Sequence, residues 1–229
     1  MDDEPPRAGP WGEAAPAPLR EPMFNVPWPA LVVVVTIVGS YALQSLLGAD
    51  AMTAAYGFVP ADLAKGRWLG VFTMMFIHGG WVHALTNALA ALAFGPPVAR
   101  LLGEDIKGGV VFFAFYLVCG LLANLGFAAL HLHETTPVVG ASGAVSGLVG
   151  AAMRRLGTED GLAPILSRPV LSLTGGWIAA NLLFALTGVS PLMGGAKVAW
   201  EAHVVGLLVG LLLIGPVWRM VQGGPHRAR

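Results

Sequence analysis

The sequence contains very little charge. Only 11% of its 229 residues are Asp, Glu, Lys or Arg, whereas a soluble domain usually carries about 25%. Hydrophobic residues make up 55% of the chain, and the mean hydropathy is +0.70. These values exclude an ordinary soluble domain and indicate one compact unit embedded in a lipid bilayer.

The chain also has no excess of positive or negative charge, and it has no second cysteine. Lys and Arg number 13, as do Asp and Glu, so nothing in the charge balance points to nucleic acid. Cys119 is the only cysteine, which excludes an internal disulfide. Residues 1–22 lack the apolar run of a signal peptide, and we expect a disordered cytoplasmic tail there, with a second cytoplasmic tail at 223–229.

Six long stretches contain no Asp, Glu, Lys or Arg, and each is long enough to hold most of a membrane-spanning helix. Within a domain of residues 23–222 they predict a bundle of six transmembrane helices, at 28–49, 80–99, 108–131, 141–156, 170–188 and 200–220. Two stretches are longer than a span requires, which predicts breaks at Gly79-Gly80 and Gly194-Gly195.

The positions of Lys and Arg predict the orientation of this bundle. With a cytoplasmic N-terminus, ten of the 13 cationic residues fall on the cytoplasmic side. The outer loops then hold only Lys65, Arg67 and Lys197. Because cytoplasmic segments are enriched in cations, we expect both termini inside, most simply in a bacterial inner membrane.

This topology brings the notable polar residues to one depth. The second, fourth and sixth predicted helices all begin at the outer face. His78, His83 and Asn87 lie on or just before the second helix, Ser142 opens the fourth, and His203 is in the first turn of the sixth. Polar groups inside a bilayer are costly and often functional, so their common depth favours a shared site.

Small residues predict that the fourth and sixth helices approach closely. They recur every four residues, at Gly143, Gly147 and Ala151 and at Ala202, Gly206 and Gly210. Such stripes allow helix backbones to pack tightly in lipid. Ser142 and His203 each neighbour one stripe, so the hydroxyl and the imidazole are expected to converge.

Convergence of these groups suits nucleophilic catalysis. A serine becomes a strong nucleophile when an adjacent base takes its proton, and histidine is the usual base near neutral pH. Asn and His side chains can donate hydrogen bonds to a developing oxyanion. Taken singly, each residue also has a structural explanation. Ser142 could be a small contact residue, His203 a histidine bonded to a carbonyl, Asn87 an interhelical hydrogen bond, and His78 and His83 interface histidines near the headgroups.

Three motifs in this chain resemble those of the rhomboid family of intramembrane serine proteases. Residues 78–87, His-Gly-Gly-Trp-Val-His-Ala-Leu-Thr-Asn, are similar to the family pattern HxxxxHxxxN. Gly140-Ala141-Ser142-Gly143 resembles GxSG, and residues 202–210 resemble AHxxGxxxG. The resemblance covers roughly residues 65–215, with each motif on the expected helix.

The resemblance implies a role for each of these residues. Ser142 would be the nucleophile and His203 the general base, without an acidic third member. His78, Asn87 and the backbone N–H of Ser142 would form the oxyanion hole, and His83 would support the site. Gly140 and Gly143 would let the backbone approach the substrate. The family cleaves transmembrane proteins in the lipid bilayer, near the outer face, without a metal or cofactor.

Two positions depart from the family pattern. An arginine common in the first outer loop is replaced here by Gly70, and an aromatic residue four positions after the nucleophile is replaced by Ser146. Ser146 lies one turn after Ser142, so its hydroxyl is a candidate partner that orients His203. The alternative is that it bonds the carbonyl four residues back, as helix serines often do.

Two other functions are weighed against proteolysis. A catalytically silent rhomboid-like protein would bind transmembrane helices without cutting them, but such a protein would be expected to lose Ser142 or His203. A metal or proton transporter would use the histidines. Transporters normally need an intramembrane carboxylate, and no Asp or Glu lies inside a predicted span, since Glu201 is at an edge.

Overall fold

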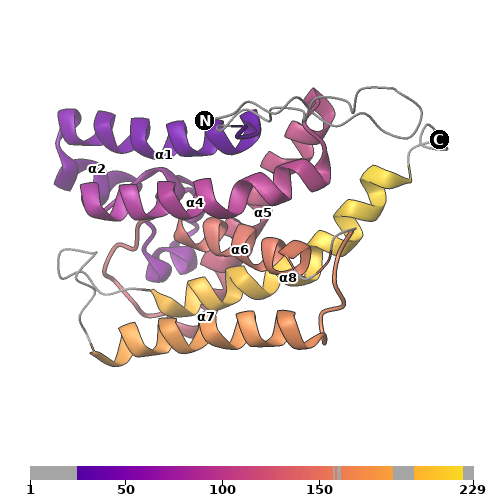
Figure 1. Cartoon of the computed structure of the whole chain (residues 1–229). Helices are drawn as coiled ribbons and strands as arrows, with labels where there is room; N and C mark the ends of the chain where they lie inside the picture. Colours follow the sequence, from indigo (N-terminus) through magenta and orange to yellow (C-terminus); the bar gives the residue numbers. More distant parts are fainter. Residues whose placement is uncertain (1–24, 157, 159–160, 188–198, 224–229) are drawn as a thin grey trace, which may run out of the picture.

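The computed structural model describes residues 25–156, 158, 161–187 and 199–223. It is a bundle of long helices (Figure 1), and no strand occurs in this part of the chain. The helices are α1 (Trp28–Leu47), α4 (Trp81–Leu102), α5 (Ile106–Leu130), α6 (Ser142–Leu156), α7 (Arg168–Thr187) and α8 (Trp200–Gln222). Each agrees with one predicted helix to within three residues at both ends. The tail predicted at 1–22 lies outside the described residues, as does all of the tail predicted at 223–229 except Gly223.

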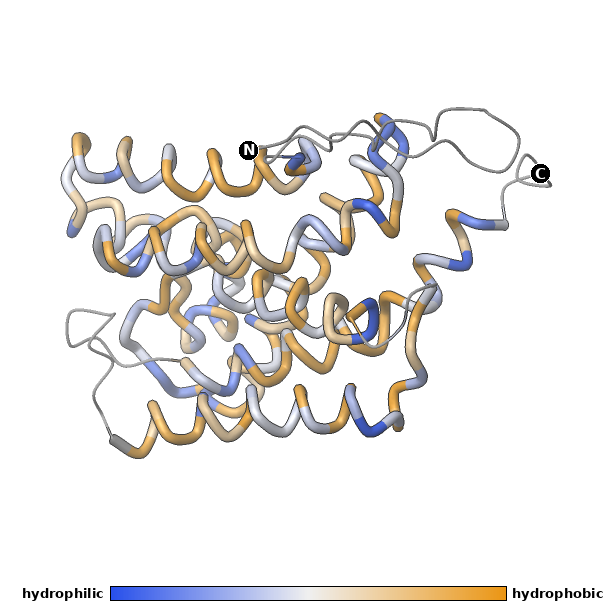
Figure 2. Tube along the Cα trace, in the orientation of Figure 1, coloured by the Kyte–Doolittle hydropathy of each residue, from blue (hydrophilic) through white to orange (hydrophobic). Residues whose placement is uncertain are grey.

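Five of these helices, α1, α4, α5, α7 and α8, are long and apolar enough to cross a membrane. Figure 2 shows their hydrophobic character along most of each helix, with hydrophilic residues concentrated near the ends. The remaining helix, α6, has 15 residues, fewer than the roughly 20 that a full span needs. The helical membrane bundle is therefore confirmed, while the count of six spans stays a prediction.

Short helices connect α1 to α4. They are α2 (Ala49–Tyr56), the 3₁₀ helix η1 (Pro60–Lys65), α3 (Leu69–Thr73) and the 3₁₀ helix η2 (Met74–Phe76). The break predicted at Gly79-Gly80 is confirmed, because α4 begins directly after it at Trp81. The break predicted at Gly194-Gly195 lies outside the described residues.

The turn between α4 and α5 follows from two residues. Gly103 ends α4 with a φ of 108°, a left-handed conformation that glycine adopts without steric penalty. Asp105 then caps α5, and its side chain accepts a hydrogen bond of 2.7 Å from the Gly108 backbone N–H. The cap satisfies one of the free donors at the helix start, so α5 can reverse direction after a three-residue connection.

Helix α6 occupies the centre of the bundle and contacts α4, α5 and α8. Every residue from 143 to 153 is buried. Its approach to α8 is so close that a Cβ added at Gly206 would overlap the Gly143 carbonyl oxygen, and one at Gly210 would overlap that of Gly147. The predicted packing of the two small-residue stripes is therefore confirmed, and it holds the start of α6 against the start of α8.

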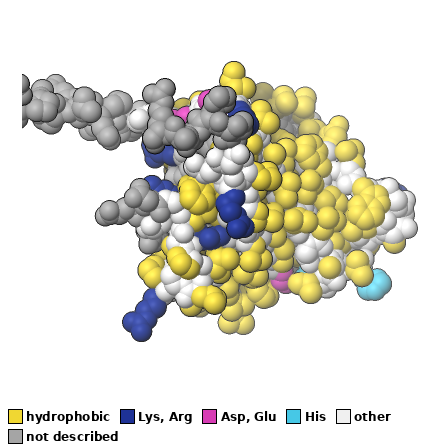
Figure 3. Space-filling view, turned by 90° about the vertical axis from the view of Figure 1, so that its right-hand side faces the viewer, with side chains coloured by type: hydrophobic (Ala, Val, Ile, Leu, Met, Phe, Trp, Pro, Cys, Tyr) yellow, Lys and Arg dark blue, Asp and Glu magenta, His cyan; other side chains and the backbone are white. Residues whose placement is uncertain are grey.

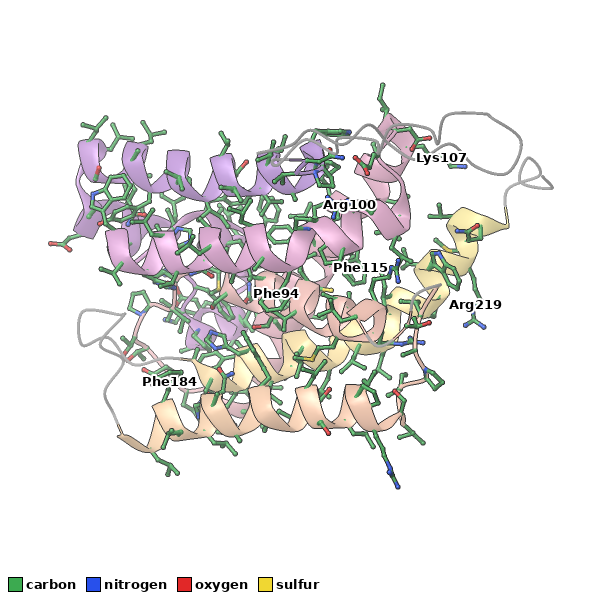
Figure 4. All side chains as sticks on the ribbon, in the orientation of Figure 1. Phe94, Arg100, Lys107, Phe115, Phe184 and Arg219 are labelled. Atoms are coloured by element: carbon green, nitrogen blue, oxygen red, sulfur yellow. The ribbon has the colours of Figure 1, made fainter. Side chains whose placement is uncertain are left out.

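Cationic side chains gather at one end of the bundle. Arg100, Lys107 and Arg219 lie toward this end, whereas Phe184 lies toward the other (Figure 4). Seen from the cationic end, Lys and Arg side chains stand beside a broad area of hydrophobic side chains (Figure 3). The bundle thus has one end rich in fixed positive charge, and the helix starts that carry Ser142 and His203 lie away from it.

Candidate active site

Ser142 and His203 meet at the starts of α6 and α8. Ser142 is the first residue of α6, and His203 is in the first turn of α8. The Oγ atom of Ser142 lies 2.8 Å from Nε2 of His203, which is a normal hydrogen-bond distance. A hydroxyl bonded to an imidazole is the arrangement that nucleophilic catalysis by serine requires.

The other nitrogen of His203 is bonded to a residue that sequence reasoning missed. Nδ1 lies 2.8 Å from Oδ1 of Asn181 on α7. Ser146 is buried on α6, but both ring nitrogens of His203 are bonded elsewhere. The hydrogen bond to His203 for which Ser146 was a candidate is therefore made by Asn181. The sequence feature that could have indicated Asn181 was its polar amide side chain inside an otherwise apolar helix.

Gly140 allows the chain to turn tightly before Ser142. Its φ is 124°, a conformation that favours glycine, and its N–H donates a hydrogen bond of 2.9 Å to the Met74 carbonyl. A Cβ at this position would lie 2.7 Å from Nε2 of His83. Gly143 is equally constrained, because a Cβ there would lie 2.7 Å from Cβ of Ala123. Both glycines permit contacts that a side chain would prevent.

The two histidines of the 78–87 motif lie edge to face, with ring centroids 5.3 Å apart. His83 faces the site, and its Nδ1 accepts a hydrogen bond of 3.3 Å from the Gly79 N–H. His78 is 1% exposed, and neither of its ring nitrogens has a hydrogen-bond partner among the described residues. The Gln44 side chain holds the backbone of His78 through two hydrogen bonds of 2.9 Å.

Asn87 lies one turn beyond His83 on α4 and is buried. Its Nδ2 donates a hydrogen bond of 2.8 Å to the His83 carbonyl oxygen. This contact is within α4, so it is not the interhelical bond considered for Asn87 from the sequence. One amide hydrogen is used in this bond, and the second is left for another acceptor.

A cavity of about 690 Å³ lies over Ser142 and His203. His83, Asn124, Phe184 and Glu201 are among its lining residues, whereas His78 and Asn87 are not. At its edge, His131 Nε2 lies 3.1 Å from Glu201 Oε1. The structure thus brings Ser142, His203, His83 and Gly143 to one cavity and leaves His78 and Asn87 buried behind it.

Residues 65–220 match the sequence model of the Rhomboid domain, which is more than half of the chain. The chain belongs to the rhomboid family. The match begins in the connection between α1 and α4 and ends in α8, so it includes every residue of the candidate site.

Relatives include two bacterial proteins and one plant protein. YdcA of Bacillus subtilis, a candidate rhomboid protease, is 29% identical over 66% of this chain and 68% of its own length. RHOMBOID-like protein 9, chloroplastic, of Arabidopsis thaliana is 33% identical over 46% of this chain. Rhomboid protease GluP of B. subtilis is 32% identical over 39%. The matches span only 23% and 16% of the last two proteins. Membership of the family suggests an intramembrane protease.

The departure of this rhomboid at Gly70 has a local explanation. A Cβ at Gly70 would lie 3.0 Å from the Gly57 carbonyl oxygen and 3.0 Å from Cα of Phe58, so a long side chain would displace the loop. The loop is instead held by Asn124 of α5, whose Nδ2 donates a hydrogen bond of 2.8 Å to the Val71 carbonyl. Close packing of Gly70 on the backbone and the Asn124 side chain thus hold this loop, in place of the arginine common in the family.

The same connection is tied to the segment that leads to Ser142. Phe58 and Val138 exchange two backbone hydrogen bonds, of 2.9 and 2.8 Å. At its surface, a hydrogen bond from Lys65 is the main cause that lowers the pKa of the Asp62 carboxyl below its usual value, and Arg67 also pairs with this carboxylate. The connection between α1 and α4 is therefore folded, and it forms one side of the cavity over Ser142.

Proposed function

We propose that this protein is an intramembrane serine protease, with Ser142 as nucleophile and His203 as general base. The observation that carries the proposal is the 2.8 Å contact between Ser142 Oγ and His203 Nε2. It is supported by the family membership and by the cavity over both residues. The substrates would be transmembrane proteins, cleaved near the outer face of the bilayer.

The reaction would proceed in two steps. As His203 takes the hydroxyl proton, Ser142 Oγ attacks the peptide carbonyl, and the imidazolium then returns that proton to the leaving amine. Water next attacks the acyl-enzyme while His203 accepts a proton from it. His203 returns this proton to Ser142 Oγ as the acyl bond breaks and the new carboxyl end is released. This chemistry requires no metal or cofactor. A substrate helix must open locally before its carbonyl can reach Ser142, because its backbone groups are otherwise paired.

Oxyanion stabilisation is assigned to His78, Asn87 and the backbone N–H of Ser142. His78 has ring nitrogens without a partner in the described part of the chain, and Asn87 has a second amide hydrogen after its bond to His83. Neither side chain lines the cavity, so both would have to move toward Ser142 to donate to the oxyanion when the substrate binds. His83, packed against Gly140, would keep the backbone before Ser142 in place.

The test of the function is labelling of Ser142 by a serine-directed phosphonate in detergent. Wild type is expected to be labelled, and Ser142→Ala is not. Asn87→Ala is expected to remain labelled while turnover of a transmembrane substrate falls about 10²- to 10³-fold, as loss of one oxyanion donor does elsewhere. An unlabelled wild type would overturn the function. Loss of both labelling and fold in Asn87→Ala would make Asn87 a structural residue.

The cationic end of the bundle supports a cytoplasmic location for that end and an outward-facing site. Lys107→Cys is expected to react with an impermeant thiol reagent only from the cytoplasm, and Lys65→Cys only from outside. Both lysines are exposed, and Cys119 is buried and serves as an unreactive background. Reaction of both variants from the same side would contradict this orientation.

A further inference from the structure

Helix α7 lies at the edge of the bundle, beside α8 and α6 (Figure 1). Among its described side chains, at 168–186, only Val170 and Asn181 are buried. A buried amide is costly in an apolar setting unless it is hydrogen-bonded. Asn181 is 7% exposed and uses both ends of its amide, one within α7 and one across to α8.

The contacts of Asn181 determine which way its amide points. Nδ2 donates a hydrogen bond of 2.9 Å to the Trp177 carbonyl oxygen. A reversed amide would place Oδ1 against that carbonyl, and two acceptors cannot bond each other. Oδ1 therefore faces His203 Nδ1, 2.8 Å away.

The direction of the amide in turn determines where His203 carries its proton. Because Oδ1 of Asn181 can only accept, a neutral His203 must carry its hydrogen on Nδ1. The lone pair of Nε2 then faces Ser142, whose hydroxyl donates to it across 2.8 Å. In the opposite tautomer, Nε2 would carry a hydrogen and could not accept the proton of Ser142.

Building on the serine-protease function proposed above, we propose that Asn181 is a positioning residue that holds His203 in the tautomer able to act as a base. Asn181 acts through His203 and does not touch the reacting atoms. Because it belongs to α7, the base is competent only while α7 lies against α8. Helix α7 also covers one side of the cavity, through Phe184 and Ala185. Movement of this helix away from α8 would therefore remove the hydrogen bond that holds His203 in its reactive tautomer.

The first test compares two substitutions on α7. Asn181→Leu keeps the approximate size of the side chain and removes the acceptor, and it is expected to lower kcat about 10- to 100-fold with little change in KM, a part of what general-base catalysis contributes. Thr174→Val is the matched control, because Thr174 makes a polar contact to Met153 of α6, 3.8 Å away, and none to His203. It is expected to keep wild-type kcat. Equal kcat in Asn181→Leu and wild type would overturn the proposal.

The second test does not depend on activity. Nitrogen-15 NMR of histidine-labelled protein at pH 8, with His203→Gln for assignment, reports which ring nitrogen carries the hydrogen. Wild type is expected to show it on Nδ1, and Asn181→Leu to show a mixture of both tautomers. Asn181→Ala provides a second variant if the leucine protein does not fold. An unchanged tautomer in a folded variant would overturn the proposal, whereas a wild type that shows the expected tautomer but neither cleaves nor reacts with phosphonate would overturn the protease function alone.

Discussion

Replacing Ser142 by alanine is expected to lower cleavage of a transmembrane substrate by about 10⁶-fold, to the background of the assay. His203→Ala is expected to cause a similar loss, because serine without an adjacent base is a poor nucleophile at neutral pH. The double variant should be no worse than either single variant. Groups that act as one unit lose their effect together.

The measurement is single-turnover cleavage in detergent or proteoliposomes, with each variant checked for a wild-type melting temperature. Ser146→Ala is the matched control. Ser146 is a buried serine one turn after Ser142 on α6, and both nitrogens of His203 are bonded to other residues, so this variant should retain wild-type turnover. Cleavage by Ser142→Ala at more than a trace would contradict Ser142 as the nucleophile.

A single methyl group at Gly210 is expected to disrupt both stability and activity. The added Cβ would overlap the carbonyl oxygen of Gly147, and neither backbone can move without separating α6 from α8. Overpacking of this kind usually costs about 1–3 kcal/mol, occasionally more. Turnover should fall about 10²-fold or more, since a displacement of about 1 Å at the reacting groups has that effect.

Gly39→Ala is the control for this substitution. Gly39 lies inside α1, and a Cβ there would meet no atom within 4 Å, so the helix should be unchanged or slightly stabilised. Thermal unfolding and single-turnover cleavage of both variants in the same detergent measure the difference. A Gly210→Ala protein that melts and cleaves like wild type would mean that α6 and α8 are not in backbone contact.

The helices could be predicted closely because the hydrophobic stretches that form them are local features of the sequence. The approach of α6 to α8 was also predictable, since the small residues at Gly206 and Gly210 recur along one helix face. The connection between α1 and α4 was not, because its form depends on distant partners such as Val138 and Asn124.

Asn181 was missed for a related reason. An amide in an apolar helix signals a polar partner, but one sequence does not say which helix supplies it. Ser146 occupies the position of a family aromatic residue on α6, so it was the candidate partner of His203, whereas the actual partner lies on α7. His78 and Asn87 were predicted to belong to the site, and in the structure both contact His83. Their burial away from the cavity depends on side-chain packing that residue spacing does not determine.

The shortness of α6 has a consequence for hydration. A helix of 15 residues is about 22 Å long, some 8 Å less than a hydrocarbon layer of about 30 Å. If Arg154 and Arg155 in its last turn lie at one boundary of that layer, Ser142 at the other end lies below the opposite boundary. Water for the proposed hydrolysis would then reach Ser142 through the cavity, which His131 and Glu201 also line. The thickness of the surrounding lipid layer would therefore determine how far water must travel through the cavity to reach Ser142.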